Sequence, residues 1–272
     1  MRLAKGIERE NRGRLELLHR SFTGPFSVAQ ATEIFGFDRE KTRKLLAYFA
    51  SRGWLSRVRR DAYTVVPLGA TAPSDWREDP WVVAAHAFAP CYLGGWTACE
   101  HWGLTEQLFL SIVVITGKRV RNRTVEIQGT RFQIKVLNDK KRFGTRPAWR
   151  GQNQVQVSDP SRTIVDILDD PKIGGGIRHV ADILAVYFKE KLRNDAELIE
   201  YAKRLGNRTV FKRLGFLVET LQIAAPQLIE ACAKQKSTGL ALLDHTISKK
   251  GRIVKKWNLR VNAEIKPVET AS

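Results

Sequence analysis

The chain has 272 residues, 43% of them hydrophobic, so it is long enough to bury one large or two ordinary cores. Its 46 lysines and arginines exceed its 28 aspartates and glutamates, and the net charge of +18 favours a polyanionic partner. The sequence has no apolar run long enough to span a membrane and no signal-peptide core near its start, so we expect a cytoplasmic protein without a membrane partner. Cys91, Cys99 and Cys232 have neither zinc-site spacing nor an even number, and core thiols are expected.

Positive charge is concentrated in three segments. Residues 1–69 contain 14 basic and 7 acidic side chains, residues 117–150 contain 11 and 2, and residues 249–260 contain 6 and none. A single basic run is most often only a solvated surface. Three such runs in one chain favour binding of nucleic acid.

Three helices and a hairpin are predicted within residues 1–68. Leucines at helical spacing indicate a first helix over residues 8–20. Ser27 and Gln30 have the spacing of a capping box, which predicts the start of a second helix with an apolar stripe. Asp38 is expected to cap a third helix.

The third predicted helix has an apolar arc and a basic arc. Leu45, Leu46 and Phe49 lie within one narrow arc and are expected to be buried. The opposite arc has the small Ala47 at its centre, so it can approach a major groove closely. Two strands follow, with a turn near residues 60–61. The predicted DNA-binding residues of the helix and the hairpin are Arg39, Glu40, Lys41, Arg43, Lys44, Arg57, Arg59 and Arg60.

This succession of elements is typical of a winged helix-turn-helix domain. The alternative is a three-helix bundle whose third helix is merely charged on its surface. The coincidence of caps, turn and basic hairpin within about 45 residues favours the winged helix-turn-helix.

A second domain over residues 80–248 is predicted beyond a proline-rich boundary at 67–80. Its strands are recognised by β-branched or alternating residues and its helices by longer apolar periodicity. Ser158 is expected to cap a helix with Pro160 in its first turn. Strands are predicted at 110–116, 124–128, 132–137 and 155–158, the middle two as a hairpin, and further helices at 81–88, 94–103, 176–189, 195–204, 207–223 and 226–235.

The predicted fold class is therefore α+β. It consists of an N-terminal winged helix-turn-helix domain and a larger α+β domain with a mixed sheet and a helical layer. A basic C-terminal segment at 249–272 is predicted to follow as a separate unit.

Residues 117–150 supply a second predicted basic surface. It either binds nucleic acid, by extending the operator contact or touching RNA, or docks an acidic protein patch. Its predicted members are Lys118, Arg119, Arg121, Arg123, Arg131, Lys140, Lys141 and Arg142.

The sequence offers no complete catalytic or metal-binding motif. The five histidines lack the spacing of zinc hydrolases and deaminases, and Cys99 and His101 would diverge on a helix. Asp166, Asp169 and Asp170 are expected to form an acidic, solvated helix face. We therefore predict no catalytic residue, no metal site and no cofactor.

A restriction-type nuclease is the one enzyme alternative. In that fold an acidic residue precedes a strand with an acid-x-Lys sequence. Here the strand has Gln133, Ile134 and Lys135, and Glu126 lies on its hairpin partner. Because Mg²⁺ requires oxygen anions, the missing carboxylate weighs against this alternative.

Three segments carry a family resemblance. Residues 91–107 read CYLGGWTACEHWGLTEQ, residues 158–177 read SDPSRTIVDILDDPKIGGGI, and residues 201–219 read YAKRLGNRTVFKRLGFLVE. In content, order and separation they resemble the AbiE-type antitoxins, the regulatory half of type IV toxin–antitoxin and phage abortive-infection systems. The resemblance covers most of residues 26–220.

The resemblance implies a winged-helix domain that represses its own operon at repeated promoter sites, so that double-stranded operator DNA is a partner. It also implies a second domain that confers immunity against a nucleotidyltransferase toxin encoded alongside, without a stable complex between the two proteins. A stand-alone winged-helix regulator without a toxin is the alternative. Two features depart from the family: the wing turn at 59–63 lacks the glycine that commonly precedes its aromatic residue, and the tail beyond residue 235 matches no motif.

Overall fold

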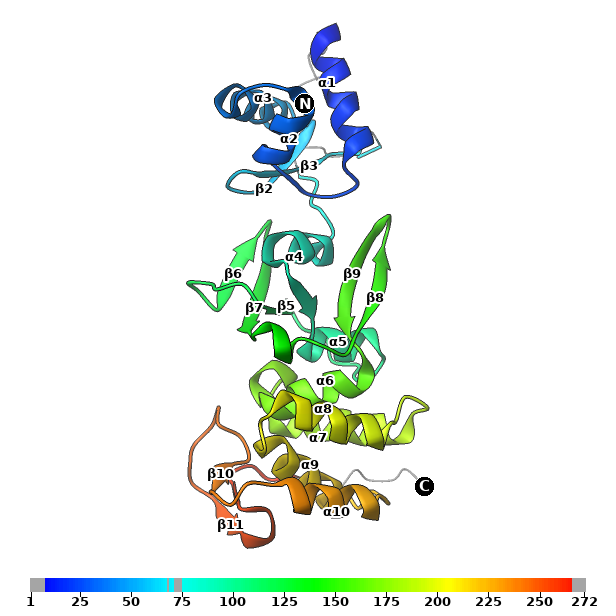
Figure 1. The fold of residues 1–272 in the computed structure, drawn as a ribbon, viewed down its shortest axis with the longest axis vertical. Helices are drawn as coiled ribbons and strands as arrows, with labels where there is room; N and C mark the ends of the chain where they lie inside the picture. Colours follow the sequence, from blue (N-terminus) through cyan, green and yellow to red (C-terminus); the bar gives the residue numbers. More distant parts are fainter. Residues whose placement is uncertain (1–7, 68, 71–74, 266–272) are drawn as a thin grey trace.

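The N-terminal part consists of three helices and a hairpin, as the sequence predicts. The computed structural model describes residues 8–67, 69–70 and 75–265 (Figure 1). Helices α1 (Arg9–Ser21), α2 (Val28–Phe35) and α3 (Arg39–Ser51) enclose a small apolar core. Strands β2 (Leu55–Arg59) and β3 (Ala62–Val65) form the hairpin, and β1 (Phe26–Ser27) pairs with β3 to give the order β1-β3-β2.

Local capping fixes how α2 meets α3. The Ser27 hydroxyl accepts from the Gln30 amide, and the Gln30 side chain accepts from the Ser27 amide, so the predicted capping box is complete. Gly36 ends α2 with a φ of 65°, a left-handed conformation that suits glycine. The Asp38 carboxylate accepts from the Lys41 amide at 2.8 Å and starts α3. Three residues thus separate the two helices.

A six-stranded mixed sheet lies at the centre of the molecule. Its order is β6-β7-β5-β4-β9-β8, with the pairs β5–β7 and β4–β9 parallel and the others antiparallel. The predicted hairpin is β6–β7, whose turn residues Gln128 and Gly129 both have positive φ. The strands are β4 (Cys91–Leu93), β5 (Ser111–Thr116), β6 (Thr124–Ile127), β7 (Thr130–Val136), β8 (Thr145–Arg150) and β9 (Asn153–Ser158).

Helices cover both faces of this sheet. Helix α4 (Pro80–Phe88) packs on one face, between the sheet and the N-terminal part (Figure 1). The other face is covered by a helical layer centred on α6 (Pro160–Asp169), in which residues 160–168 are all buried. The remaining helices are α5 (Gly95–His101), α7 (Ile177–Lys189), α8 (Asp195–Leu205), α9 (Thr209–Thr220) and α10 (Pro226–Gln235).

Several boundaries differ from the prediction. Asp159 rather than Ser158 caps α6, because its carboxylate accepts from the Arg162 amide at 2.7 Å while the Ser158 hydroxyl bonds to Thr163. Helix α9 is shorter than the expected 207–223. Strands β4 and β8 were not predicted: β4 has three residues, and β8 contains Pro147, which an edge strand accommodates.

The predicted division after residue 248 is wrong, because the chain beyond it packs into the helical layer. Strands β10 (Ala241–Leu242), β11 (Arg252–Val254) and β12 (Leu259–Val261) form a small sheet. Trp257 is fully buried, and a Cβ atom on Gly215 of α9 would lie 2.1 Å from its ring. Residues 266–272 of the predicted segment lie outside the described residues.

The N-terminal part also contacts the sheet domain directly. Val58 and Ala62 of the hairpin join the core formed by α4 and the sheet. The Gln128 amide donates to the Ser56 hydroxyl at 2.9 Å. Of the predicted boundary at 67–80, residues 68 and 71–74 lie outside the described residues. In the part that is described, no helix is both long and apolar enough to cross a membrane.

Candidate nucleic-acid interface

Helix α3 presents a basic face to solvent. Leu46, Phe49 and Thr42 are buried beneath it, and Leu45 is half-buried. We call the opposite side the outer face of α3; all of its residues are exposed, and its cationic side chains at positions 39, 43 and 44 retain 65%, 47% and 77% of their surface. The outer face comprises Arg39, Glu40, Arg43, Lys44 and Ala47.

An acidic residue in the turn of the β2–β3 hairpin pairs with the arginines of this face. The Nε and Nη2 atoms of Arg43 donate to the two carboxylate oxygens of Asp61 at 3.2 and 3.3 Å, and Arg39 Nη2 lies 3.5 Å from the same carboxylate. Asp61 has a φ of 57°, a left-handed conformation that aspartate tolerates better than most residues. In the sequence Asp61 is recognisable only as a turn residue, because its two arginine partners lie in a different element.

The other predicted contacts of this domain are exposed as well. Arg57, Arg59 and Arg60 lie at or beside the end of the β2–β3 hairpin. Lys41 lies at the margin of the outer face with its ammonium 4.0 Å from the centre of the Phe37 ring. Glu40 pairs with Lys44 at 2.7 Å, one helical turn away. The structure therefore brings together the predicted helix residues and the predicted wing residues on one exposed surface.

The second basic surface is mostly exposed, with one exception. Arg142 is not part of it, because its guanidinium pairs with Asp139, donates to the Pro90 carbonyl at 3.0 Å and retains 14% of its surface. Lys141 is half-buried. The exposed members are Lys118, Arg119, Arg121, Arg123, Arg131 and Lys140.

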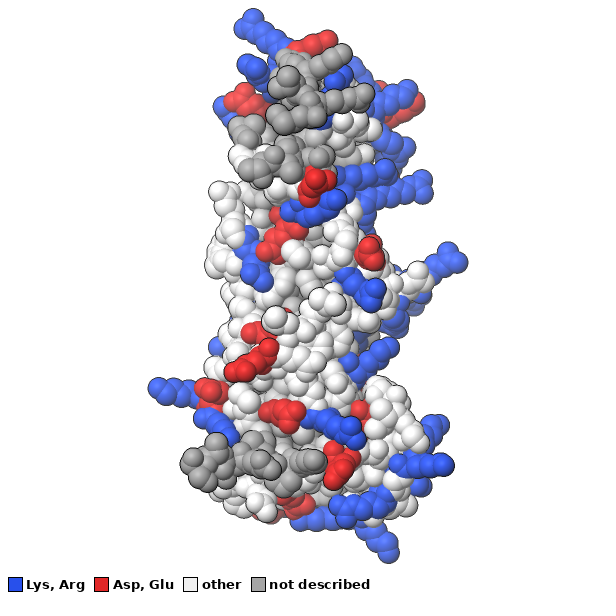
Figure 2. Space-filling model, turned by 180° about the vertical axis from the view of Figure 1, so that it is seen from behind, with Lys and Arg blue, Asp and Glu red and all other residues white. Residues whose placement is uncertain are grey.

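The β2–β3 hairpin and the second basic surface adjoin each other. The Gln128 amide in the β6–β7 turn reaches the β2 backbone, 3.4 Å from the Arg57 carbonyl. Burial lowers the pKa of His86, and the charges of Arg59 from the β2–β3 hairpin and Lys118 from the second basic surface lower it further. Figure 2 shows lysine and arginine side chains gathered along the long edge that carries α3, β2 and β6 in Figure 1.

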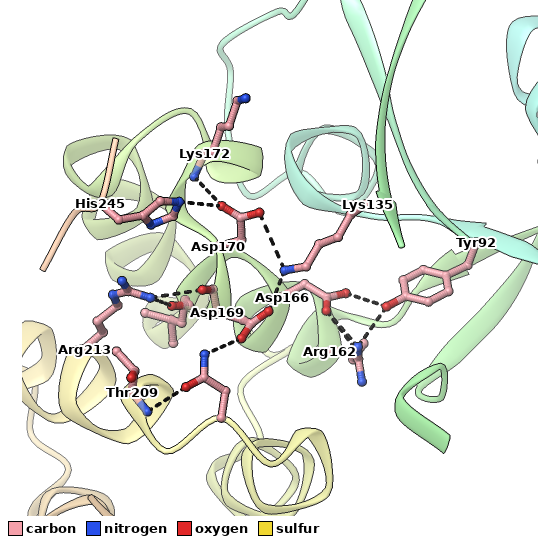
Figure 3. Close-up of polar contacts among 12 residues, drawn as sticks. Tyr92, Lys135, Arg162, Asp166, Asp169, Asp170, Lys172, Thr209, Arg213 and His245 are labelled. Carbon is pink, nitrogen blue, oxygen red and sulfur yellow. Dashed lines mark hydrogen bonds and ion pairs between the residues drawn. The ribbon is translucent and has the colours of Figure 1, made fainter. Parts of the chain in front are cut away.

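A buried polar cluster lies on the opposite side of the sheet, around α6 (Figure 3). Arg162 and Asp166 have no exposed surface and pair one helical turn apart, at 2.8 Å. The Tyr92 hydroxyl donates to Asp166 at 3.0 Å and accepts from Arg162 at 2.9 Å. Burial disfavours the charged guanidinium, but Asp166 and Tyr92 outweigh it and raise the pKa of Arg162.

Asp169 joins α6 to the sheet and to α9. Its carboxylate pairs with Lys135 of β7 at 2.5 Å and accepts from Asn207 at 2.6 Å. Burial alone would raise its pKa, but the charge and hydrogen bond of Lys135, with the Asn207 bond, lower it. Arg213 of α9 donates to the Leu168 and Asp169 carbonyls.

This cluster bears on two sequence interpretations. The expected acidic, solvated face of α6 does not exist, because Asp166 is fully buried and Asp169 keeps 14% of its surface in an ion pair. Lys135 and Glu126, the fragments of a nuclease constellation, are not brought together: Glu126 pairs in register with Arg131, about 13 Å along β7 from Lys135. Within the described residues no group of three histidine, cysteine or acidic side chains could hold a metal ion.

The three segments that carry the family resemblance meet in this cluster. Tyr92 belongs to the first segment, Arg162 and Asp169 to the second, and Asn207 and Arg213 to the third. These five residues lie in the interior contacts of the second domain, whereas Glu106 and Gln107 at the end of the first segment are exposed.

Comparison with known proteins supports the fold alone. No protein-family model and no curated protein sequence matches the chain. Among solved structures, the chain is similar to the crystal structure of the RV2827C protein from Mycobacterium tuberculosis, with a TM-score of 0.65 and 16% sequence identity. The similarity covers 94% of this chain and 92% of that one, so it extends over both the N-terminal part and the second domain.

Breaking the buried Arg162–Asp166 ion pair should destabilise the fold strongly, and replacing both residues with apolar ones should restore most of the stability. Asp166→Asn leaves the Arg162 guanidinium buried without its counter-charge, so we expect the free energy of unfolding to fall by about 3–5 kcal/mol in denaturant titrations. The double variant Arg162→Met/Asp166→Leu should recover most of this loss. Glu40→Gln, which breaks an exposed pair, serves as control and should cost less than about 1 kcal/mol. A loss below 1 kcal/mol for Asp166→Asn would show that the pair is not a stabilising element.

Proposed function

We propose that this protein is a DNA-binding transcriptional autoregulator and the antitoxin of a type IV toxin–antitoxin system, acting in the cytoplasm. The observation that carries the DNA-binding part is the exposed, cationic outer face of α3 beside a hairpin with three exposed arginines. A helix of this kind fits the major groove of duplex DNA, and a basic wing fits the adjacent backbone or minor groove.

The geometry suggests a role for each side chain in the proposed complex. Arg43 and Lys44 meet phosphates or base edges, and Ala47 at the centre allows the helix backbone to approach the groove. Glu40 accepts from a cytosine amino group once Lys44 turns to DNA. Asp61 holds the Arg43 guanidinium in one position in the free protein, which reduces the conformational entropy that binding must remove.

The antitoxin part of the proposal rests on the sequence resemblance. The resembling segments build the core of the second domain, so that domain is the proposed antitoxin unit. The exposed second basic surface is available for RNA or for an acidic protein patch. A stand-alone regulator is the alternative in which the second domain has no toxin to counter.

We expect Arg43→Ala/Lys44→Ala to abolish the gel shift of duplex DNA taken from upstream of the protein's own reading frame. Each phosphate contact that is lost should also reduce the slope of log K against log salt by about 0.9. Because both side chains are exposed, the free energy of unfolding should change by less than about 1 kcal/mol.

Lys189→Ala/Lys191→Ala provides the matched control, since both lysines are exposed near the end of α7. This control should bind DNA as the unmodified chain does. Unchanged binding by the α3 variant would remove α3 from the recognition role, and failure of the unmodified chain to bind would remove the DNA-binding proposal.

The antitoxin part predicts a nucleotidyltransferase reading frame beside this gene. Expression of that enzyme alone should arrest growth, and co-expression of this chain should restore it without the two proteins co-purifying. The Arg43→Ala/Lys44→Ala variant should still restore growth when driven by a foreign promoter. If growth remains arrested when the intact chain is co-expressed, the antitoxin proposal is contradicted and the stand-alone regulator is favoured.

A further inference from the structure

The C-terminal sheet presents a basic loop on a rigid support. Trp257 is buried against α9 and donates from its indole nitrogen to Glu219 at 2.6 Å. The Asn262 side chain donates to the Asp244 and Ser248 carbonyls at 2.6 and 2.8 Å and so fixes the chain that leads into the loop. This segment lies outside the family resemblance, and its charge plays no part in the function proposed above.

The cations of this loop are free to bind a ligand. Residues 249–260 contain no acidic side chain. Lys256 pairs with Glu219. The four cations that precede Lys256 in the segment are exposed, and they form no ion pair with any residue between 8 and 265 that the structure describes. We call these four the C-terminal basic loop: Lys249, Lys250, Arg252 and Lys255.

The C-terminal basic loop shares an edge with the other basic surfaces. Figure 1 places α3, β2, β6, β10 and β11 along one long edge of the molecule. Figure 2, seen from behind, shows lysine and arginine side chains along that edge from the N-terminal part to the C-terminal sheet. The α7–α8 connection lies on the opposite edge (Figure 1).

From this arrangement we infer that the C-terminal basic loop binds the phosphate backbone of the same DNA duplex that α3 engages. The inference rests on the proposed DNA binding. A duplex is a straight rod with one negative charge per roughly 1.7 Å of its axis, so it matches a linear series of cationic surfaces better than a single acidic protein patch does. The loop would lengthen the footprint and add affinity, while α3 supplies sequence recognition.

The test uses the full chain and two lengths of upstream duplex. The longer duplex has about 40 base pairs, or roughly 140 Å at 3.4 Å per pair. The shorter has about 12 base pairs, a little over one helical turn, and is centred on the bases that the unmodified chain protects from hydroxyl radicals. With the longer duplex, Lys249→Ala/Lys250→Ala should reduce the salt slope by about 1.8 and raise the dissociation constant about tenfold or more at low salt. With the shorter duplex the variant should match the unmodified chain, and hydroxyl-radical footprints on the longer one should shrink at one end.

Lys189→Ala/Lys191→Ala, on the opposite edge, removes the same charge and should leave both duplexes unaffected. The inference is overturned if the C-terminal variant binds the longer duplex like the unmodified chain, if the control loses as much, or if the loss appears only with single-stranded RNA. Parallel measurement of Arg43→Ala/Lys44→Ala separates the two proposals. If that variant loses binding while the C-terminal variant does not, DNA binding stands and only the role of the loop fails.

Discussion

Burial of the Arg162 guanidinium is the constraint on which the second domain depends. Moving an uncompensated charge out of water costs several kcal/mol, so α6 is stable only where Asp166 and Tyr92 meet that charge. One guanidinium nitrogen, Nη1, has no hydrogen-bond partner among the described residues, and the Phe143 ring 4.2 Å from the guanidinium carbon supplies a cation–π contact. The same helix ends in Asp169, which pairs with Lys135 of β7 and accepts from Arg213 of α9 through its carbonyl. The contacts of Arg162 and Asp169 therefore connect the sheet, α6 and α9.

The buried polar cluster and the exposed basic surfaces occupy different parts of the molecule. The cluster lies in the core of the second domain, and the basic surfaces lie along one long edge (Figures 1 and 2). Tyr92, Arg162 and Asp166 form the buried cluster beside α6. The cations of α3, the β2–β3 hairpin and the C-terminal basic loop lie outside this cluster and are exposed. Substitutions on the edge can accordingly alter what is bound without disturbing the fold, because exposed ion pairs contribute little stability.

Local signals made the N-terminal part predictable. The capping box, the left-handed glycine after α2 and the Asp38 cap are all short-range interactions, and the sequence spacing specifies them completely. The exposed face of α3 followed from helical periodicity. The β6–β7 hairpin was predictable for the same reason, from alternation on either side of a tight turn.

Long-range partners were not predictable from spacing. Arg142 is indistinguishable in sequence from its exposed neighbours until Asp139 and the Pro90 carbonyl enclose it. Lys135 and Asp169 meet across 34 positions of chain, and Trp257 packs against Gly215 of α9 from a segment about 40 residues later. Asp61 looked like an ordinary turn residue because its partners come from a helix about 20 residues earlier.

The central claim is that the outer face of α3 lies against duplex DNA. Ala47, exposed at the centre of that face, is the position from which to test it with a photo-cross-linking amino acid, and Glu190, exposed at the end of α7, is the control position. Irradiation with upstream duplex DNA should yield a protein–DNA cross-link from position 47 and none from position 190. DNA binding without a cross-link from position 47, or equal cross-linking from both positions, would contradict the claim.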